Sequence, residues 1–346
     1  MWFKKQNCDV ICIGSASKDI FFPTDEAVLI DTPEDITSKQ KIAFELGGKY
    51  RVADRFEAVG GVAANVSQGL ARMGFRVGCY SNVGNDEIGR WIERVLEKEK
   101  VLSEFLSFDE TARTDLSAII VMTQNGERTI FHNRDANEKL LIRKELIVST
   151  DWLFVSALNG AWVQNMETLL EVKRNKNFRL ALNPGQHNIK ENTSALLPVI
   201  KETDVLLLNK DEAIELLMHT DIVSSETQLN DELFLLESLH SLGAKVIGMT
   251  DGKRGGWGFD GSEYWFCPIH TRSGVLDTTG AGDAFGSGFI AAHLKGLALS
   301  DSLSYGMANS GSVVGFYGAS EGLLSDAEMK EQRKNIVPKK LKDVAR

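Results

Sequence analysis

Short, uninterrupted runs of apolar residues alternate along this chain with segments in which apolar residues recur every three or four positions. The runs that predict strands are Val10–Ile13, Val77–Tyr80, Ser117–Met122, Trp152–Val155, Arg179–Leu182, Val205–Leu208 and Lys245–Met249. The segments that predict helices are Ala63–Met73, Glu87–Lys98, Gln164–Arg174, Asp211–Leu217 and Leu229–Leu242. Strands that are apolar throughout are typically buried on both faces, as in a parallel sheet covered by helices. The alternation predicts an α/β fold with a doubly wound, mostly parallel sheet and a ligand site at the carboxyl ends of its strands.

The pattern breaks between residues 24 and 59, which are polar, mixed in charge and carry short candidate strands at Lys41–Leu46 and Phe56–Val59. A segment that leaves a doubly wound sheet early and then returns suggests a small β lid over the site. A surface excursion without function would have the same composition. We expect an α/β domain of residues 1–23 and 60–346. The tail from Glu328, rich in Lys, Glu and Arg, predicts a helix and a solvated end.

Composition limits the classes of partner. The net charge of −9, from 39 basic and 48 acidic residues among 346, argues against nonspecific binding to nucleic acid or to an anionic membrane surface. No apolar stretch approaches the roughly 20 residues of a membrane span, and Val10–Ile13 is too short for the core of a signal peptide. The four cysteines lack metal-binding spacing, so we expect reduced thiols in a cytoplasmic protein.

The segment Asp277-Thr278-Thr279-Gly280-Ala281-Gly282-Asp283, followed by a predicted helix of small residues, carries the clearest chemical signal. Glycines at a helix N-terminus let backbone N–H groups converge on an anion. A carboxylate among these donors repels the anion, but it is useful if it takes a proton beside a phosphate, as in phosphoryl transfer to a hydroxyl. Asp283 could instead be an ordinary N-terminal helix residue. A dinucleotide fingerprint at Gly280, Gly282 and Gly286 has a spacing one residue too long, and no P-loop pattern is present.

Two further polar positions could face a ligand near the start of the chain. Gly60-Gly61 opens a predicted helix in which Asn65 lies close to the apolar side, so its amide needs a partner. That partner is either neighbouring backbone or a polar ligand. Asp19 follows the first predicted strand, where a carboxylate could hold a sugar diol through two acceptor oxygens. A solvated turn residue is the simpler interpretation of Asp19 alone.

Two turns at the ends of later strands could bind a nucleotide. Asn209 follows Val205–Leu208, and Glu212 comes three residues later, so the pair could organise hydrated Mg²⁺ and phosphate. The same pattern is that of a helix N-cap with a capping box. The turn from Thr250 to Gly255 follows another buried strand and precedes a β-ribbon-like segment at Trp257–Phe266. Alone it is only a turn.

In this fixed order the motifs resemble the ribokinase-like, or PfkB-type, carbohydrate kinase family over nearly the whole chain. The two family signatures match Gly60–Gly84 and Asp277–Gly288, the second almost residue for residue. The resemblance implies that Asp283 is the general base and that the Gly280, Ala281 and Gly282 backbone forms the anion hole. It implies that residues 24–59, with strands from 115–137, form the lid.

The resemblance also implies the cofactors ATP and Mg²⁺, with a monovalent cation such as K⁺ in many members. Positions that match ATP-binding residues are Asn209, Thr250, Gly252, Gly255 and Asn309. Glu212 would act on Mg²⁺ through water. Asp277 and Thr279, with backbone around Phe316–Gly318, match the monovalent-cation site. Positions that match sugar-binding residues are Asp19, Gly61 and Asn65.

We therefore expect an ATP-dependent kinase that phosphorylates the primary hydroxyl of a sugar or sugar-like molecule, as a monomer or homodimer. Val62 and Ser17 depart from the ribokinase pattern, in which Lys and Asn are typical, and Gly60–Asn65 looks more like fructokinases. Arg134 could reach a sugar carboxylate or hydroxyl, or could be a solvated rim charge. The alternatives are a nucleoside (adenosine-type) kinase, a non-catalytic ligand-binding protein on the same scaffold and, as the weakest, a dinucleotide oxidoreductase.

Overall fold

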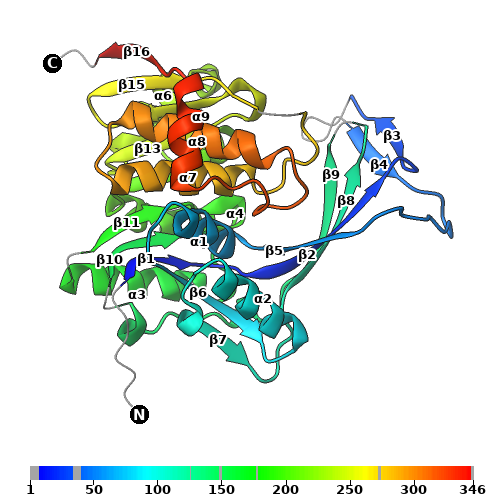
Figure 1. The fold of residues 1–346 in the computed structure, drawn as a ribbon. Helices are drawn as coiled ribbons and strands as arrows, with labels where there is room; N and C mark the ends of the chain where they lie inside the picture. Colours follow the sequence, from blue (N-terminus) through cyan, green and yellow to red (C-terminus); the bar gives the residue numbers. More distant parts are fainter. Residues whose placement is uncertain are drawn as a thin grey trace.

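The computed structural model describes residues 8–33, 40–124, 126–147, 150–176, 178–271 and 274–343, arranged around a central ten-stranded sheet (Figure 1). The strand order is β16-β15-β14-β13-β12-β11-β10-β1-β6-β7. In chain order these strands are β1 (Cys8–Ile13), β6 (Val77–Gly84), β7 (Leu106–Asp109), β10 (Thr150–Val155), β11 (Arg179–Leu182), β12 (Val205–Asn209), β13 (Val246–Thr250), β14 (Gly256–Phe259), β15 (Glu263–Cys267) and β16 (Lys339–Asp343). Pairing is parallel from β13 through β7 and antiparallel from β13 to β16. The predicted doubly wound, mostly parallel α/β sheet is confirmed.

Helices cover both faces of this sheet and bury two hydrophobic cores against it. The helices are α1 (Val62–Arg72), α2 (Glu87–Lys98), α3 (Trp162–Asn175), α4 (Gly185–Lys201), α5 (Lys210–Met218), α6 (Glu232–Ser241), α7 (Ala281–Leu294), α8 (Leu299–Val313) and α9 (Asp326–Gln332). One core packs under α3 to α6 and the other under α1, α2 and α7 to α9. The inner strands β6, β10, β11 and β12 are buried along most of their length, as expected for strands covered by helices on both faces. Within the described ranges, no helix is long and apolar enough to span a membrane.

A second, four-stranded sheet projects from one side of the central sheet (Figure 1). Its order is β5 (Phe56–Gly60), β2 (Ser17–Thr24), β8 (Leu116–Met122) and β9 (Arg128–Asn133). The hairpin of β3 (Val28–Asp31) and β4 (Gln40–Ala43) continues from it. Strand β2 belongs to this sheet from Ser17 onward, whereas the expected lid begins at residue 24. Residues 34–39 of the expected lid lie outside the described residues.

Three other features of the structure were not expected from the sequence. The apolar run at Ser117–Met122 forms β8 of the small sheet and not a central strand, because its long-range partner is β2. The polar segment Gly185–Lys201 forms α4, which contains Pro198 and a non-helical Asn192 and so lacks a regular stripe. Residues 339–343 of the tail form β16, which pairs with β15 at the sheet edge, while residues 344–346 lie outside the described residues. Lysines are common on such edge strands.

Candidate functional site

The motif at the start of α7 lies at the carboxyl ends of the central strands. Gly280 is the N-cap of α7 and has φ 74°, a left-handed conformation that favours glycine. A Cβ on Gly280 would lie 2.1 Å from the Ala319 methyl group. Helix α7 therefore begins at Ala281 with its first turn directed at a cavity, and its N-terminus supplies donors and a positive dipole end.

This cavity has a volume of about 520 Å³, and Thr278, Ala281 and Gly282 form part of its wall. Its other polar lining residues include Asn209, Thr250, Gly252, Lys253, His270, Thr271 and Ser310. Its apolar lining residues are Ile269, Val275, Met307 and Val314. A hollow of this size, partly apolar and with polar groups at a helix N-terminus, suits a small anionic molecule with a flat apolar portion.

The carboxyl group of Asp283 is held by a residue that lies far away in the chain. Asn65 Nδ2 donates to Asp283 Oδ2 at 2.7 Å, and Asn65 is only 4% exposed. Burial raises the pKa of Asp283 to about 6, against the lowering effect of the Asn65 hydrogen bond, and the charges of Asp19 and Glu212 raise it further. Asn65 Oδ1 is buried without a hydrogen-bond partner. The pKa of Asp283 is therefore close to the value that suits a general base at neutral pH. The unpaired Oδ1 of Asn65 lies beside this carboxyl group.

Asp19 lies on β2, at the root of the small sheet, and is 8% exposed. Ser17 Oγ donates to Asp19 Oδ1 at 3.2 Å. Burial raises the pKa of Asp19, while hydrogen bonds from Ser117 and Ser17 oppose this rise. A Cβ on Gly60 would lie 2.0 Å from Asp19 Oδ2, so only glycine lets this carboxyl group lie against the backbone. Gly61 follows as the N-cap of α1.

Arg134 extends from the end of β9 to the same region. Its Nη1 lies 3.6 Å from Asp115 Oδ2 and is buried without a hydrogen-bond partner. The charge of Arg134 also lowers the pKa of Asp19. Asp115 is fully buried and accepts the backbone N–H groups of Asp135 and Asn137. This pairing makes Arg134 more than a solvated rim charge and leaves a donor for a ligand.

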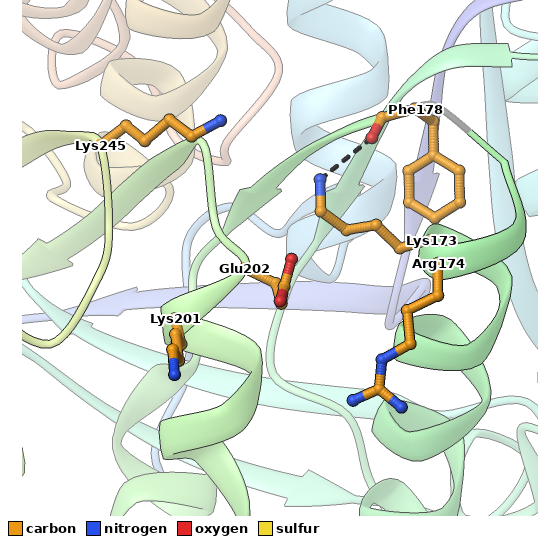
Figure 2. A pocket seen from close by; sticks show the side chains of 6 residues that line it. All are labelled: Lys173, Arg174, Phe178, Lys201, Glu202 and Lys245. Carbon is orange, nitrogen blue, oxygen red and sulfur yellow. Dashed lines mark hydrogen bonds between the residues drawn. The ribbon is translucent and has the colours of Figure 1, made fainter.

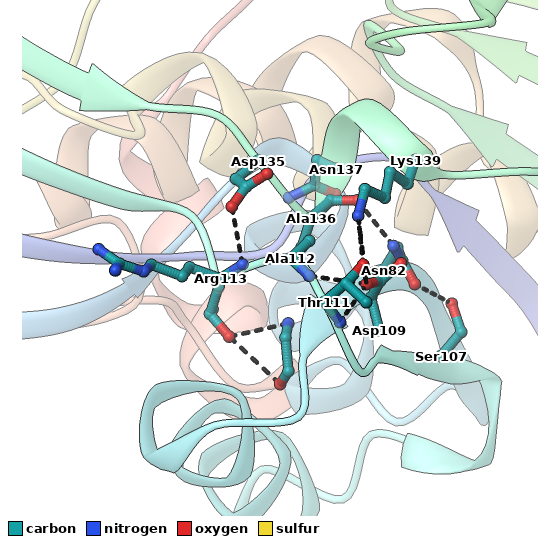
Figure 3. Close-up of polar contacts among 12 residues, drawn as sticks. Asn82, Ser107, Asp109, Thr111, Ala112, Arg113, Asp135, Ala136, Asn137 and Lys139 are labelled. Carbon is teal, nitrogen blue, oxygen red and sulfur yellow. Dashed lines mark hydrogen bonds and ion pairs between the residues drawn. The ribbon is translucent and has the colours of Figure 1, made fainter.

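Figure 3 shows the polar contacts that fix the chain where it returns from the small sheet. Arg113 N donates to Asp135 Oδ2 at 2.8 Å, and Lys139 Nζ bonds to Thr111 Oγ1 at 2.7 Å. Nearby, Asn82 Nδ2 donates to the carbonyl of Ala136 at 2.7 Å. These bonds join the loop after β7 to the segment that carries Arg134, so Arg134 rests on a rigid support.

Asn209 and Glu212 form the complete capping box of α5. Glu212 N donates to Asn209 Oδ1 at 2.8 Å, and Asn209 N donates to Glu212 Oε2 at 3.0 Å. Asn209 is nevertheless exposed and lines the cavity, and burial raises the pKa of Glu212. Asn209 pairs in register with Thr250 of β13. The turn that contains Gly252 and Gly255 follows directly, so the two predicted nucleotide-binding turns are neighbours.

Asp277 is fully buried and organises the backbone before α7. Its Oδ1 accepts Thr279 N at 2.9 Å and Thr279 Oγ1 at 2.7 Å, and its Oδ2 accepts Gly318 N at 3.2 Å. The residues matched to a monovalent-cation site are thus brought together. Asn309 is different, because it is fully buried in α8. Its amide bonds to Ala284 O, Ser287 Oγ and Leu324 N, so it joins helices and does not face the cavity.

The pfkB family carbohydrate kinase model matches residues 9–326 of this chain. The chain belongs to the pfkB family of carbohydrate kinases. Fructokinase-2 of Oryza sativa subsp. japonica is 29% identical over 245 residues, which cover 66% of this chain and 69% of that protein.

Solved structures have the same fold. Arabidopsis thaliana ribokinase, complexed with ribose and ATP, has a TM-score of 0.73 and 18% identity over 95% of this chain and 99% of its own. Burkholderia thailandensis nucleoside kinase, complexed with inosine, has a TM-score of 0.76 and 15% identity over 94% of this chain and 98% of its own. At these identities the likeness establishes the ribokinase-like fold and not the substrate.

One residue of this pfkB-family kinase was missed by the sequence analysis. Arg128, at the start of β9, lines the cavity and donates a hydrogen bond from Nη1 to Thr278 Oγ1. Its Nε is buried without a hydrogen-bond partner. A Cβ on Gly126 would lie 3.1 Å from Leu276 O, so the β8–β9 turn reaches the segment before α7. A single arginine in a hairpin has no spacing that marks it, and only the fold brings it to this site.

A second cavity, of about 240 Å³, lies at the amino ends of the central strands (Figure 2). Four cations surround it, but Lys173 bonds to Phe178 O at 3.0 Å, and Lys173 and Lys245 both pair with Asp204, at 3.1 and 2.7 Å. Lys201 lies in the last turn of α4, where a positive charge complements the helix dipole. These lysines are explained by the fold alone.

Proposed function

We propose that this pfkB-family kinase transfers the γ-phosphoryl group of ATP to the primary hydroxyl of a sugar or sugar-like molecule. The observation that carries the proposal is the Asp283 carboxyl group, which is bonded to Asn65 and has a pKa of about 6 at the N-terminus of α7. A binding protein would gain nothing from a desolvated carboxylate beside an anion site, whereas a base needs this position.

In the proposed reaction, Asp283 accepts the proton of the acceptor hydroxyl while the new O–P bond forms. The bond between the γ-phosphorus and the bridging oxygen breaks, ADP leaves, and Asp283 later releases the proton to water. The N–H groups at the start of α7 hold the transferring phosphoryl oxygens, and Arg128 neutralises part of their charge. This division of work is typical of phosphoryl transfer, where positioning and charge stabilisation dominate.

Mg²⁺ would neutralise phosphate charge, with Asn209 and Glu212 holding its water ligands. In the described ranges, no three His, Cys, Asp or Glu side chains gather around one point that could hold a metal. An ion bound mainly by phosphate oxygens and water fits this arrangement, since Mg²⁺ often takes few protein ligands. We also propose that Asp277 and Thr279 support a monovalent-cation site.

The acceptor pocket favours a polyhydroxylated substrate. Asp19 offers carboxylate oxygens, and both Asn65 Oδ1 and Arg134 Nη1 are buried without a hydrogen-bond partner. An arginine beside a sugar pocket can bind a carboxylate or a keto oxygen. Val62 and Ser17 depart from the ribokinase pattern, so we propose that a hexose-like or keto-deoxy sugar is preferred over ribose and adenosine.

The deciding experiment compares wild type with Asp283→Asn. We expect the substitution to lower kcat by about 10²–10⁴-fold, the range for a lost general base, while calorimetry shows ATP binding largely retained. The acceptor is identified from kcat/KM for fructose, 2-keto-3-deoxygluconate, ribose and adenosine at saturating MgATP. A near-wild-type kcat for Asp283→Asn would exclude Asp283 as the general base and leave it only a structural role in the first turn of α7. A preference for adenosine above about tenfold, or ~1.4 kcal/mol, would instead favour a nucleoside kinase.

A further inference from the structure

The small sheet contacts the loop between α8 and α9 through an aromatic stack. The ring of Tyr317 lies on that of Phe56 in β5, with centroids 4.6 Å apart and planes inclined by 21°. Tyr317 also packs against the buried Phe21 of β2, with centroids 6.4 Å apart. Two strands of the lid therefore meet one residue of the loop between α8 and α9, which lies outside the catalytic motif.

The next residue carries this contact to the catalytic backbone. A Cβ on Gly318 would lie 2.8 Å from the methyl group of Ala58 in β5, and φ is 93°, so the strand lies directly on this glycine. Gly318 N donates to Asp277 Oδ2 at 3.2 Å. The other oxygen of Asp277 holds both the amide and the hydroxyl of Thr279, which directly precedes Gly280.

The same strand also contacts the acceptor pocket. Ala58 pairs in register with Asp19 across β5 and β2, and Asp19 is the proposed sugar-binding carboxylate. A continuous series of contacts therefore runs from Asp19 through Ala58, Gly318 and Asp277 to Gly280. Gly318 and Asp277 are buried and Ala58 is partly buried. Close-packed groups transmit a displacement because they have little free volume.

We propose that Tyr317 is a positioning residue, which couples the placement of the lid on the sugar pocket to the geometry of the anion hole. Its ring holds β5 against Gly318, and Gly318 in turn fixes Asp277 and the backbone that leads into α7. The anion hole is then in its productive shape only when the lid lies on Tyr317. This proposal rests on the proposed kinase function, but its first test needs no turnover.

The first test is amide hydrogen exchange in the substrate-free protein across residues 278–282. We expect Tyr317→Leu to speed exchange there by about tenfold, the upper end of what one aromatic pair supplies. Phe56→Leu, on a strand at the surface, should have the same effect from the lid side. Tyr317→Phe keeps the stack, and Phe131→Leu removes a 65% exposed lid ring that is absent from the stack. Both should stay within about twofold of wild type.

Unchanged exchange at 278–282 in both leucine variants would overturn the proposal. Equal acceleration along all of α7 and α8 would also overturn it, because that result indicates general destabilisation. This outcome is independent of the kinase assignment, which fails only if no acceptor is phosphorylated.

The second test is a kinetic double-mutant cycle with the identified acceptor. Tyr317→Leu should lower kcat by about tenfold with KM for ATP changed less than about twofold, and Tyr317→Phe should restore the rate. The double variant of Tyr317 and Phe56 should be no slower than Tyr317→Leu alone, because both substitutions break one contact. Additive losses, or a loss confined to KM for ATP, would contradict coupling through this stack.

Discussion

Replacing Asp283 by asparagine should stabilise the folded protein while it removes the activity. Burial raises the pKa of this carboxyl group from 3.8 to about 6. The ionised form is therefore less stable in the folded protein than in the unfolded chain. Asparagine has the same shape, carries no charge and can still accept the hydrogen bond from Asn65 through its own Oδ1. The substitution therefore removes a destabilising charge without creating a cavity.

The magnitude follows from the size of the pKa shift. A rise from 3.8 to about 6 corresponds to roughly 3 kcal/mol at a pH where the folded carboxyl group is ionised. Because the Asp283 side chain is partly exposed, solvent screening reduces the expected gain to about 1–2 kcal/mol. The sign is fixed by linkage. The folded state binds the proton more tightly, so the stability tied to protonation is present below pH ~4 and is lost as the pH rises through about 6.

Urea denaturation of wild type and Asp283→Asn at pH 8 and pH 5 tests this reasoning. The variant should be more stable by about 1–2 kcal/mol at pH 8, and this advantage should shrink to about half at pH 5, where the wild-type carboxyl group is mostly protonated. Asp211→Asn, at an exposed acidic residue in the first turn of α5, is the matched control. A variant that is no more stable than wild type at pH 8, or an advantage that is independent of pH, would refute the assignment of a desolvated charge.

Three further predictions concern the phosphate end of the site. Glu212→Gln should raise the Mg²⁺ concentration for half-maximal rate by about 10-fold while sparing KM for the sugar, because Glu212 would act through metal-bound water. If the magnesium dependence of the rate is unchanged and the variant is less stable than wild type, Glu212 acts only in the capping box of α5. Replacing K⁺ by a bulky organic cation at constant ionic strength should lower the rate if Asp277 and Thr279 support a cation site, and equal rates would count against it. Arg128→Lys should lower kcat by about tenfold with KM for the sugar unchanged, because lysine keeps the charge but loses the planar fork of donors. A rate equal to that of wild type would show that Arg128 has only a structural role, through its hydrogen bond to Thr278.

The sequence predicted the central fold well because its signals are local. The apolar stripe of Val62, Val66, Leu70 and Met73 places one face of α1 against the core, and the structure buries all but Val62 fully. The run at Ser117–Met122 predicted a strand correctly but assigned it to the wrong sheet. Whether β8 pairs with β2 or with a central strand depends on contacts between residues distant in the chain. The apolar pattern of a single strand does not indicate which strand it pairs with.

The candidate site was predictable as separate motifs but not as an arrangement. Asp283 and Asn65 stood out because a pair of glycines precedes each of them, yet nothing local indicated that their side chains form a hydrogen bond with each other across the fold. The family resemblance placed Asn309 among the ATP-binding residues, whereas its buried amide joins α8 to α7 and to the segment before α9. Arg128 was missed for the opposite reason, since it is an isolated cation whose position is set by the small sheet.

The electrostatics of the site give the strongest reason to regard it as incomplete without its ligands. Burial raises the pKa of Asp19, Glu212 and Asp283 alike, and the charges of the first two raise that of the third. Three desolvated acids are costly in a folded protein unless a partner offsets their charge. Hydroxyl donors from a polyol would serve Asp19, a hydrated divalent ion would serve Glu212, and the acceptor hydroxyl would serve Asp283. Because the charges of Asp19 and Glu212 both raise the pKa of Asp283, the three acids are coupled, and binding both substrates should stabilise the fold by more than the sum of each alone. Thermal-shift titrations with sugar, MgATP and both together would measure this effect.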